Sequence, residues 1–160
     1  MSKSGKLGPQ LKEDQKQFRK AMRNILTLAS NDAVNFFTEN FKRGGFLDNT
    51  VIPWEPRKTE NMTKKQRRGS IGRGILIGPP GNGARLKNSI SRSRGMTYKS
   101  VIIGIKGPAQ AYASIHNFGL RGKAWGKHPF TMPRRQFMGE SRTLNRKIIK
   151  LIDENVKKAL

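Results

Sequence analysis

The chain has 160 residues, enough for one domain with a hydrophobic core and too few for a nucleotide-driven motor with a second domain. Its 33 Lys and Arg against 10 Asp and Glu give a net charge of +23, which predicts a polyanion or an acidic protein surface as partner. The absence of cysteine excludes disulfides, thiol catalysis and cysteine-bound zinc, and no apolar run is long enough to span a bilayer or to act as a signal peptide. We therefore expect a soluble protein, made in the cytosol, with no membrane partner.

The first part of the chain is predicted to be helical. Residues 1–10 are polar and basic, and we expect them to be flexible. From Leu11 to Lys42, apolar residues recur every three or four positions, which is typical of an amphipathic helix, and Gly44 and Gly45 end it. This is long for a globular helix, and the polar residues 30–32 could cap a second one, so one helix and two consecutive helices both remain open.

The middle of the chain alternates between loops and short strands. Residues 46–74 show no period of either kind and are predicted to form a long basic loop. Residues 75–77 are a short strand candidate, and residues 86–90 fit either a strand or one helical turn. The best strand is 98–105, because Val101, Ile103 and Ile105 alternate with other residues and share one face.

The last third contains two predicted helices. Residues 109–118 fit a short helix that Gly119 stops, and residues 120–132 are predicted to be a second basic loop. Residues 140–160 carry a regular apolar stripe and are predicted to be helical. The whole of 1–160 is thus expected to be a single α+β domain. In it a small, mostly antiparallel sheet packs with the N-terminal helix or helices, a short central helix and a C-terminal helix.

The stretch ILIGPPGNGARL, residues 75–86, resembles a phosphate-binding loop. Gly78 and Gly83 have the spacing of G-x-x-x-x-G-K-[S/T], but Ala84 and Arg85 stand where lysine and a hydroxyl are needed. The only histidines, His116 and His128, lie on different predicted elements, and without cysteine they make a weak metal site. We therefore predict no catalytic residue, no cofactor and no metal, and hence no enzyme.

Two short motifs carry the strongest signal: YASIHNFG at 112–119 and MPRRQFMG at 132–139, following Trp54. Their order and spacing resemble the phage virion morphogenesis family, which includes tail-completion and neck proteins of tailed phages. The resemblance covers roughly residues 35–160, with Met138 where leucine is usual and a longer Pro- and Gly-rich turn after residue 77. The residues that match the family pattern are Tyr112, Ala113, Ile115, His116, Phe118, Gly119, Pro133, Arg135, Phe137 and Gly139.

The physical chemistry of these residues favours structural roles. Tyr112, Ile115 and Phe118 are spaced three apart along one side of the short helix and are expected in the core or in an interface. Gly119 and Gly139 permit turns, Pro133 disfavours helix before it, and His116 is expected to form a hydrogen bond at a helix end. Arg135 is expected either to pair with a carboxylate of a neighbouring subunit or to face solvent. Trp54 is expected either to anchor the basic loop or to fill a pocket in a neighbour.

The resemblance implies a structural virion protein at the head–tail junction or the head-proximal end of the tail, present in the host cytoplasm during assembly. It implies a closed ring, often sixfold, that joins head to tail and lines the DNA passage. The implied partners are copies of itself, portal-adaptor, neck or tail-tube proteins, and double-stranded DNA. The loop at 78–85 is expected to contact a neighbouring subunit or another partner protein.

The basic loops could face duplex DNA or acidic protein surfaces, and the sequence does not choose between them. A basic nucleic-acid-binding protein of the ribosomal or nucleoid type remains the alternative function. It explains the charge but not the two motifs. The cations expected to make these contacts are Arg57, Lys58, Lys64, Lys65, Arg67, Arg68, Arg73, Arg121, Lys123 and Lys127.

Overall fold

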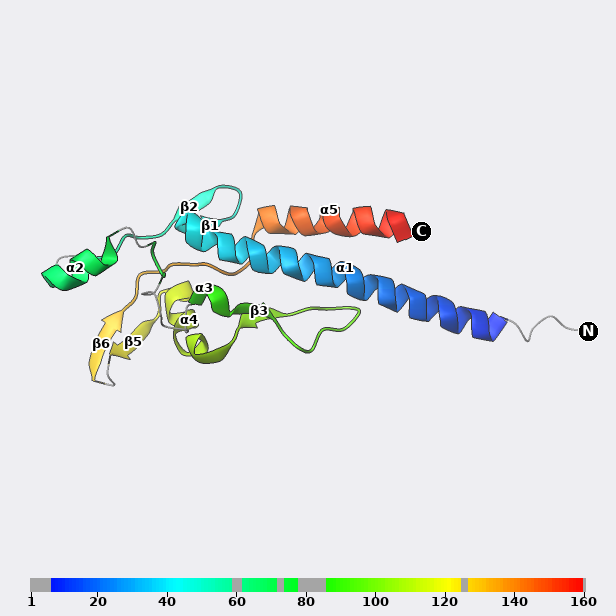
Figure 1. Ribbon diagram of the computed structural model, residues 1–160, viewed down its shortest axis with the longest axis horizontal. Helices are drawn as coiled ribbons and strands as arrows, with labels where there is room; N and C mark the ends of the chain where they lie inside the picture. Colours follow the sequence, from blue (N-terminus) through cyan, green and yellow to red (C-terminus); the bar gives the residue numbers. More distant parts are fainter. Residues whose placement is uncertain (1–6, 59–61, 72–73, 78–85, 125–126, 160) are drawn as a thin grey trace, which may run out of the picture.

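One long helix forms the axis of the molecule in the computed structural model, which describes residues 7–58, 62–71, 74–77, 86–124 and 127–159. Helix α1 (Leu7–Arg43) has 37 residues and is therefore about 55 Å long (Figure 1). The alternative of two helices is wrong. Ser30 is 1% exposed and donates to the Thr27 carbonyl within the helix, so its hydroxyl does not cap a second one. Of the segment 1–10 that is expected to be flexible, residues 7–10 belong to this helix, and residues 1–6 lie outside the described residues.

The predicted C-terminal helix is present as α5 (Arg142–Ala159), which lies along α1 in Figure 1. Its start is fixed by two acceptors: Ser141 Oγ accepts from the Leu144 amide, and Asp48 Oδ1 accepts from the Arg142 amide. An ion pair of 3.3 Å joins Lys147 to Asp32 of α1. The two helices run in opposite directions, because the end of α5 reaches residues 18–25 of α1.

In the described part of the chain, six short strands pair as three separate two-stranded antiparallel sheets. The α+β class is confirmed, with the strands distributed over three hairpins instead of gathered in one sheet. The hairpins are β1 (Gly45–Leu47) with β2 (Val51–Pro53), β3 (Ile90–Arg92) with β4 (Ile103–Ile105), and β5 (Arg121–Ala124) with β6 (His128–Thr131). Each strand has three or four residues and pairs with its neighbour in the chain, so no long-range strand pairing is needed.

The predicted loops contain regular structure. Residues 46–74 include β2 and helix α2 (Lys64–Ser70), which a capping box between Thr63 and Gln66 starts. Within residues 120–132, the strands Arg121–Ala124 and His128–Thr131 pair as the β5–β6 hairpin, in which the Phe130 ring lies over Gly122, where a Cβ would come within 2.6 Å of it. Both loop predictions are wrong because strand pairing and capping give these polar segments a defined backbone that their composition does not reveal.

The predictions for residues 75–105 are partly wrong. Residues 75–77 form a turn and not a strand, with the amide of Ile77 donating to the Gly74 carbonyl. Residues 86–90 were expected to form either a strand or one helical turn, and both are present: α3 (Leu86–Ser89) is one helical turn, and β3 begins at Ile90. The strand expected over 98–105 is shorter and spans Ile103–Ile105.

The hydrophobic core lies where the second half of α1 meets the other elements. Phe36, Phe37 and Phe41 of α1 pack with Leu86 of α3 and Leu144 of α5. The central helix α4 (Gln110–Phe118) follows a 3₁₀ turn, η2 (Gly107–Ala109), and contributes the buried residue Ala113. Gly119 ends α4 in the left-handed conformation, with φ of 69°, as the sequence predicts. The core thus places both motif segments beside the C-terminal end of α1.

Candidate functional site

Two buried asparagines hold the second motif segment in place. Asn117 Oδ1 accepts from the amides of Phe137 and Met138 at 2.9 and 3.0 Å. On the other side, Asn40 Nδ2 donates to the Phe137 carbonyl at 3.1 Å. The Phe137 side chain is 1% exposed, and its ring centroid lies 5.2 Å from that of Phe41. The residues after α4 are therefore fastened to α4 and to α1 at one point.

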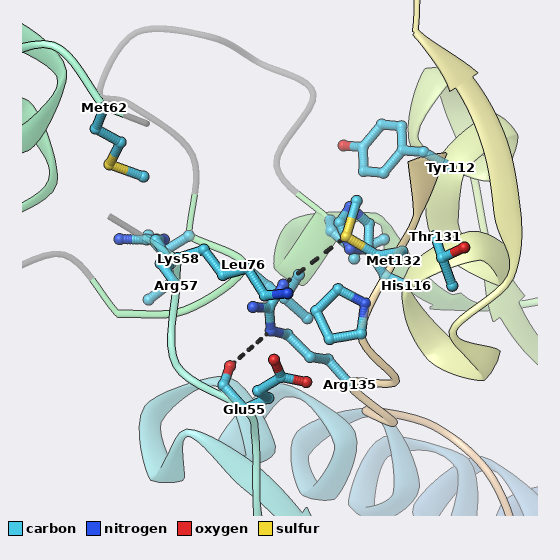
Figure 2. A pocket seen from close by; sticks show the side chains of 13 residues that line it. Glu55, Arg57, Lys58, Met62, Leu76, Tyr112, His116, Thr131, Met132 and Arg135 are labelled. Atoms are coloured by element: carbon cyan, nitrogen blue, oxygen red, sulfur yellow. Dashed lines mark hydrogen bonds between the residues drawn. The ribbon is translucent and has the colours of Figure 1, made fainter. Parts of the chain in front are cut away.

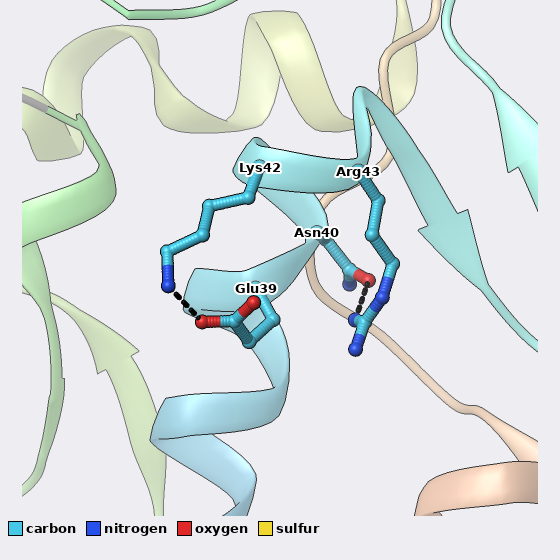
Figure 3. A network of polar contacts seen from close by, with 4 residues as sticks. All are labelled: Glu39, Asn40, Lys42 and Arg43. Atoms are coloured by element: carbon cyan, nitrogen blue, oxygen red, sulfur yellow. Dashed lines mark hydrogen bonds and ion pairs between the residues drawn. The ribbon is translucent and has the colours of Figure 1, made fainter.

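Asn40 also organises the end of α1, as Figure 3 shows. It is fully buried, and its Oδ1 accepts from the Leu47 amide at 3.2 Å and from Arg43 Nη1 at 3.4 Å. On the neighbouring surface, Lys42 pairs with Glu39 at 2.5 Å, and this hydrogen bond lowers the pKa of the Glu39 carboxyl. The single Asn40 side chain thus ties together α1, β1 and the second motif.

Trp54 anchors its segment to its own chain, which is one of the two roles expected for it. Its side chain is 5% exposed, and its ring meets Phe41 edge to face at 5.5 Å. Its Nε1 donates to the Gln136 carbonyl at 2.6 Å. The residues after β2 are therefore fixed against the second motif.

Arg135 has a role that neither sequence alternative described. It is 7% exposed, so it does not face solvent. Its Nε donates to the Glu55 carbonyl at 3.0 Å and its Nη2 to the Pro56 carbonyl at 3.2 Å, while its backbone amide donates to the His116 carbonyl at 2.8 Å. Burial lowers its pKa, and the nearby Glu55 carboxylate opposes that effect. The guanidinium binds carbonyls of its own chain and so connects the Trp54 segment with the second motif, while the backbone amide connects the second motif with the first.

A surface pocket of about 750 Å³ opens where these segments meet (Figure 2). His116 is one of its lining residues. Its Nδ1 is buried and has no hydrogen-bond partner among the described residues, so the hydrogen bond expected for His116 is not found at this atom. Burial, and secondarily the charge of Arg135, lowers the pKa of His116. The other described side chains around the pocket are mostly apolar or cationic, with two hydroxyls and one carboxylate among them: Glu55, Arg57, Lys58, Met62, Leu76, Ile77, Leu86, Tyr112, Thr131, Met132, Pro133 and Arg135.

The remaining motif residues divide between the scaffold and the surface. Gly119 lies against the 133–139 segment, where an added Cβ would come within 2.9 Å of the Arg134 backbone. Gly139 has φ of 144°, which favours glycine. Ile115 is half-buried, but Phe118 is 60% exposed, so a core position for Phe118 is wrong. The face of α4 that is buried in this chain carries Ala113 and Asn117 instead.

The predicted cations gather at one end of the molecule. Arg57 and Lys58 border the pocket, and Arg57 Nη2 donates to the Gly74 carbonyl at 2.6 Å. The others lie on α2 and on the β5–β6 hairpin, at the end opposite the start of α1 in Figure 1, and Arg73 lies outside the described residues. We call this the basic end; its described members are Arg57, Lys58, Lys64, Lys65, Arg67, Arg68, Arg121, Lys123 and Lys127.

Sequence reasoning missed Asn40 and Asn117, which hold the site together. A signal was available: each is a polar residue within a stretch whose neighbours have helical apolar spacing, and a buried polar side chain needs partners. Their partners lie 97 and 20 or 21 residues away, so only the fold identifies them.

No group of three or more His, Asp or Glu in the described ranges is arranged to hold a metal ion. The loop compared with a phosphate-binding loop, Gly78 to Arg85, lies outside the described residues, as does any contact it makes. Within these same limits, no helix combines the length and apolar character needed to cross a bilayer.

Comparison with known proteins identifies one relationship. A family model described as the phage virion morphogenesis family matches residues 48–157, which include Trp54, the pocket and both motifs. No curated protein and no solved structure matches the chain significantly.

Proposed function

Because the chain belongs to the phage virion morphogenesis family, we propose that it is a structural protein of a tailed-phage virion, placed at the head–tail junction or at the head-proximal end of the tail. The observation that carries the proposal is the family match over residues 48–157, which includes Trp54, both motifs and every residue that lines the pocket. In this scaffold the motif residues hold segments together and do not converge on a reacting atom. The role is one of joining parts and not of catalysis.

The subunits form a closed ring, with six copies as the expected number. Ring contacts between identical subunits join two different patches, so each subunit needs a surface for each neighbour. Phe118 supports one such patch, since it belongs to the first motif yet is 60% exposed, and the adjacent Leu120 is 45% exposed. An aromatic side chain that its own core does not use is suited to the core of a subunit contact.

The basic end docks onto an acidic surface of a neighbouring neck, portal-adaptor or tail-tube protein. Its pocket combines an apolar floor, which includes Leu76 and Met132, with a cationic rim of Arg57 and Lys58. A protein segment that carries an apolar side chain beside a carboxylate matches both features. The ring encloses the path of the genome, so the duplex is a partner of the assembled protein.

Light scattering after size-exclusion chromatography tests the ring. The purified protein is expected to show a mass near six times the 18.0 kDa of the chain. Phe118→Ser should lower this mass, whereas Phe18→Ser, at a side chain of closely similar exposure (61%) on the far part of α1, should leave it unchanged. A cryo-electron map of the neck of intact particles then gives position and copy number.

A wild-type protein that stays monomeric and never co-purifies with virions would contradict the proposal. If such a monomer also bound nucleic acid on its own, the alternative function, a nucleic-acid-binding protein of the ribosomal or nucleoid type, would replace the virion role. An equal loss of mass in both Phe→Ser variants would place the contact elsewhere than at Phe118.

A further inference from the structure

A row of cations runs along the first half of α1, far from the basic end. All five side chains are exposed, and a shallow groove runs between them. At 100° per residue they fall within an arc of about 100° around the helix axis. We call this row the α1 stripe; its members are Lys12, Lys16, Arg19, Lys20 and Arg23.

The opposite side of the same helix carries the apolar residues. Phe18 and Met22 lie with Ile25 beside Val156, where the end of α5 reaches α1. The centres of the apolar side and of the α1 stripe are about 140° apart around the axis. The stripe therefore points away from α5 and lies on the side of α1 that does not pack against α5.

Few groups of the chain itself neutralise the stripe. Among the described residues, Lys16 is its one member in an ion pair, with Glu13 at 3.7 Å, and both side chains are largely exposed. Arg19 instead stacks over the ring of Tyr98, which belongs to the β3–β4 hairpin, at 5.1 Å. Surface pairs of this kind contribute little to stability, so the positive charge remains available to a partner.

The spacing of the stripe fits a regular row of anions. Residues four apart on one helix face have Cβ atoms about 6 Å apart, and the stripe extends over about 16 Å of a straight helix. Duplex DNA offers a row of phosphates, with one charge per about 1.7 Å of its axis, and its major groove of about 12 Å admits a helix. The lysines and arginines of the stripe bind phosphates through their positive charge. Because phosphate contacts carry no sequence information, this binding is independent of the base sequence.

Other partners fit the stripe less well. A bilayer takes up the apolar side of a surface helix, but in this chain that side of α1 lies against Val156 at the end of α5. An acidic protein usually adds apolar contacts, but the groove between the five cations has Gln15 as its other lining residue. The geometry thus favours a nucleic acid backbone.

We propose that the α1 stripe is the surface by which this protein contacts duplex DNA, independently of base sequence, and that the basic end contacts protein. The identification of that duplex with the phage genome rests on the proposed function, whereas the binding itself does not. This proposal also orients the subunit in a ring: the α1 stripe faces the enclosed DNA.

Binding of the full-length protein to a labelled duplex of about 30 base pairs, measured from about 50 to about 200 mM NaCl, tests the inference. The stripe variant replaces four cations by glutamine, a comparably good helix former, and keeps Arg19 because of its contact with Tyr98. Its changes are Lys12→Gln, Lys16→Gln, Lys20→Gln and Arg23→Gln. The control variant removes the same charge from α2 through Lys64→Gln, Lys65→Gln, Arg67→Gln and Arg68→Gln.

For the wild-type protein, phosphate contacts by the four cations that the stripe variant replaces contribute a loss of affinity of about 10²-fold over this range of salt. The stripe variant should reduce the slope of log affinity against log salt by roughly 3.6, while the control should change it by less than about 1. Circular dichroism should show the same helix content in all three proteins.

Three results would overturn the inference: equal losses in both variants, a larger loss in the α2 variant, or binding to vesicles rich in phosphatidylserine in place of the duplex. Failure here is distinct from failure of the proposed function. The stripe variant should still show the mass of the ring, and a protein that binds the duplex but never forms a ring would refute only the virion role.

Discussion

The two hydrogen bonds that Asn117 accepts make a quantitative prediction for Asn117→Ala. The side chain of Asn117 is 7% exposed, and its Oδ1 is the acceptor for the amides of Phe137 and Met138. Alanine leaves both amides without this acceptor. Phe137 is 1% exposed, so water does not readily replace the lost partner.

The expected cost follows from the burial of the two amides. A buried amide left without a partner costs about 1–3 kcal/mol, and the amide of the less buried Met138 lies at the low end of that range. We therefore expect Asn117→Ala to lower the free energy of unfolding by about 3 kcal/mol. With a urea slope of about 2 kcal/mol per molar, the unfolding midpoint falls by roughly 1.5 M.

Urea unfolding followed by circular dichroism measures this effect, with equal protomer concentrations because assembly also stabilises the fold. Asn145→Ala on α5 is the matched control, since Asn145 is exposed and its replacement should change the stability by less than about 0.5 kcal/mol. Hydrogen exchange adds a local readout, in which the amides of residues 137 and 138 lose protection. The reasoning fails if the two variants have the same midpoint, or if these amides stay protected in Asn117→Ala.

Three further predictions address the same site. Trp54→Phe keeps the aromatic packing but leaves the Gln136 carbonyl without its donor, and it should cost about 1–2 kcal/mol in urea unfolding; a change below a few tenths would show that the hydrogen bond contributes little. Gly119→Ala should cost clearly more than Gly107→Ala, because both have φ of 69° but only Gly119 has backbone within 2.9 Å of an added Cβ; equal costs would contradict this. Burial lowers the pKa of His116, so the unfolded chain binds its proton first as pH falls. Stability should be complete above about pH 6.5 and decline below it by at most about 1.4 kcal/mol per pH unit, and His116→Gln should remove this decline. A decline that persists unchanged in His116→Gln would assign it to another group.

The position of His116 shows why the pocket was not foreseen. In the sequence it is one of two isolated histidines, and nothing nearby suggests a partner. In the fold its carbonyl accepts from the Arg135 amide, 19 residues later, and Arg135 in turn reaches carbonyls about 80 residues earlier. The pocket exists because the Trp54 segment and the two motifs, which are distant in sequence, lie together in the fold. Hydrophobic periodicity along the sequence does not predict such long-range contacts.

Local physics determined what could be predicted from the sequence alone. The helical character of the first part of the chain, the short helix stopped by Gly119 and the C-terminal helix follow from apolar spacing and from a glycine that tolerates positive φ, which are properties of neighbouring residues. The motifs likewise indicated the family, because order and spacing are features of the chain itself. The sequence did not decide between one first helix and two.

The tertiary structure decided which residues of each element are buried and therefore what each one does. Phe118 was expected in the core or in an interface; its exposure excludes the core, and the interface stays a prediction. Asn117 beside it is buried, and its side-chain oxygen accepts from two amides of the second motif. Arg135, with its charge, was expected to meet a carboxylate or solvent, yet it is enclosed by carbonyls of the segment that Trp54 anchors. Helical spacing predicts that a face is buried, but burial of a particular polar group depends on partners that only the folded chain brings within hydrogen-bond distance.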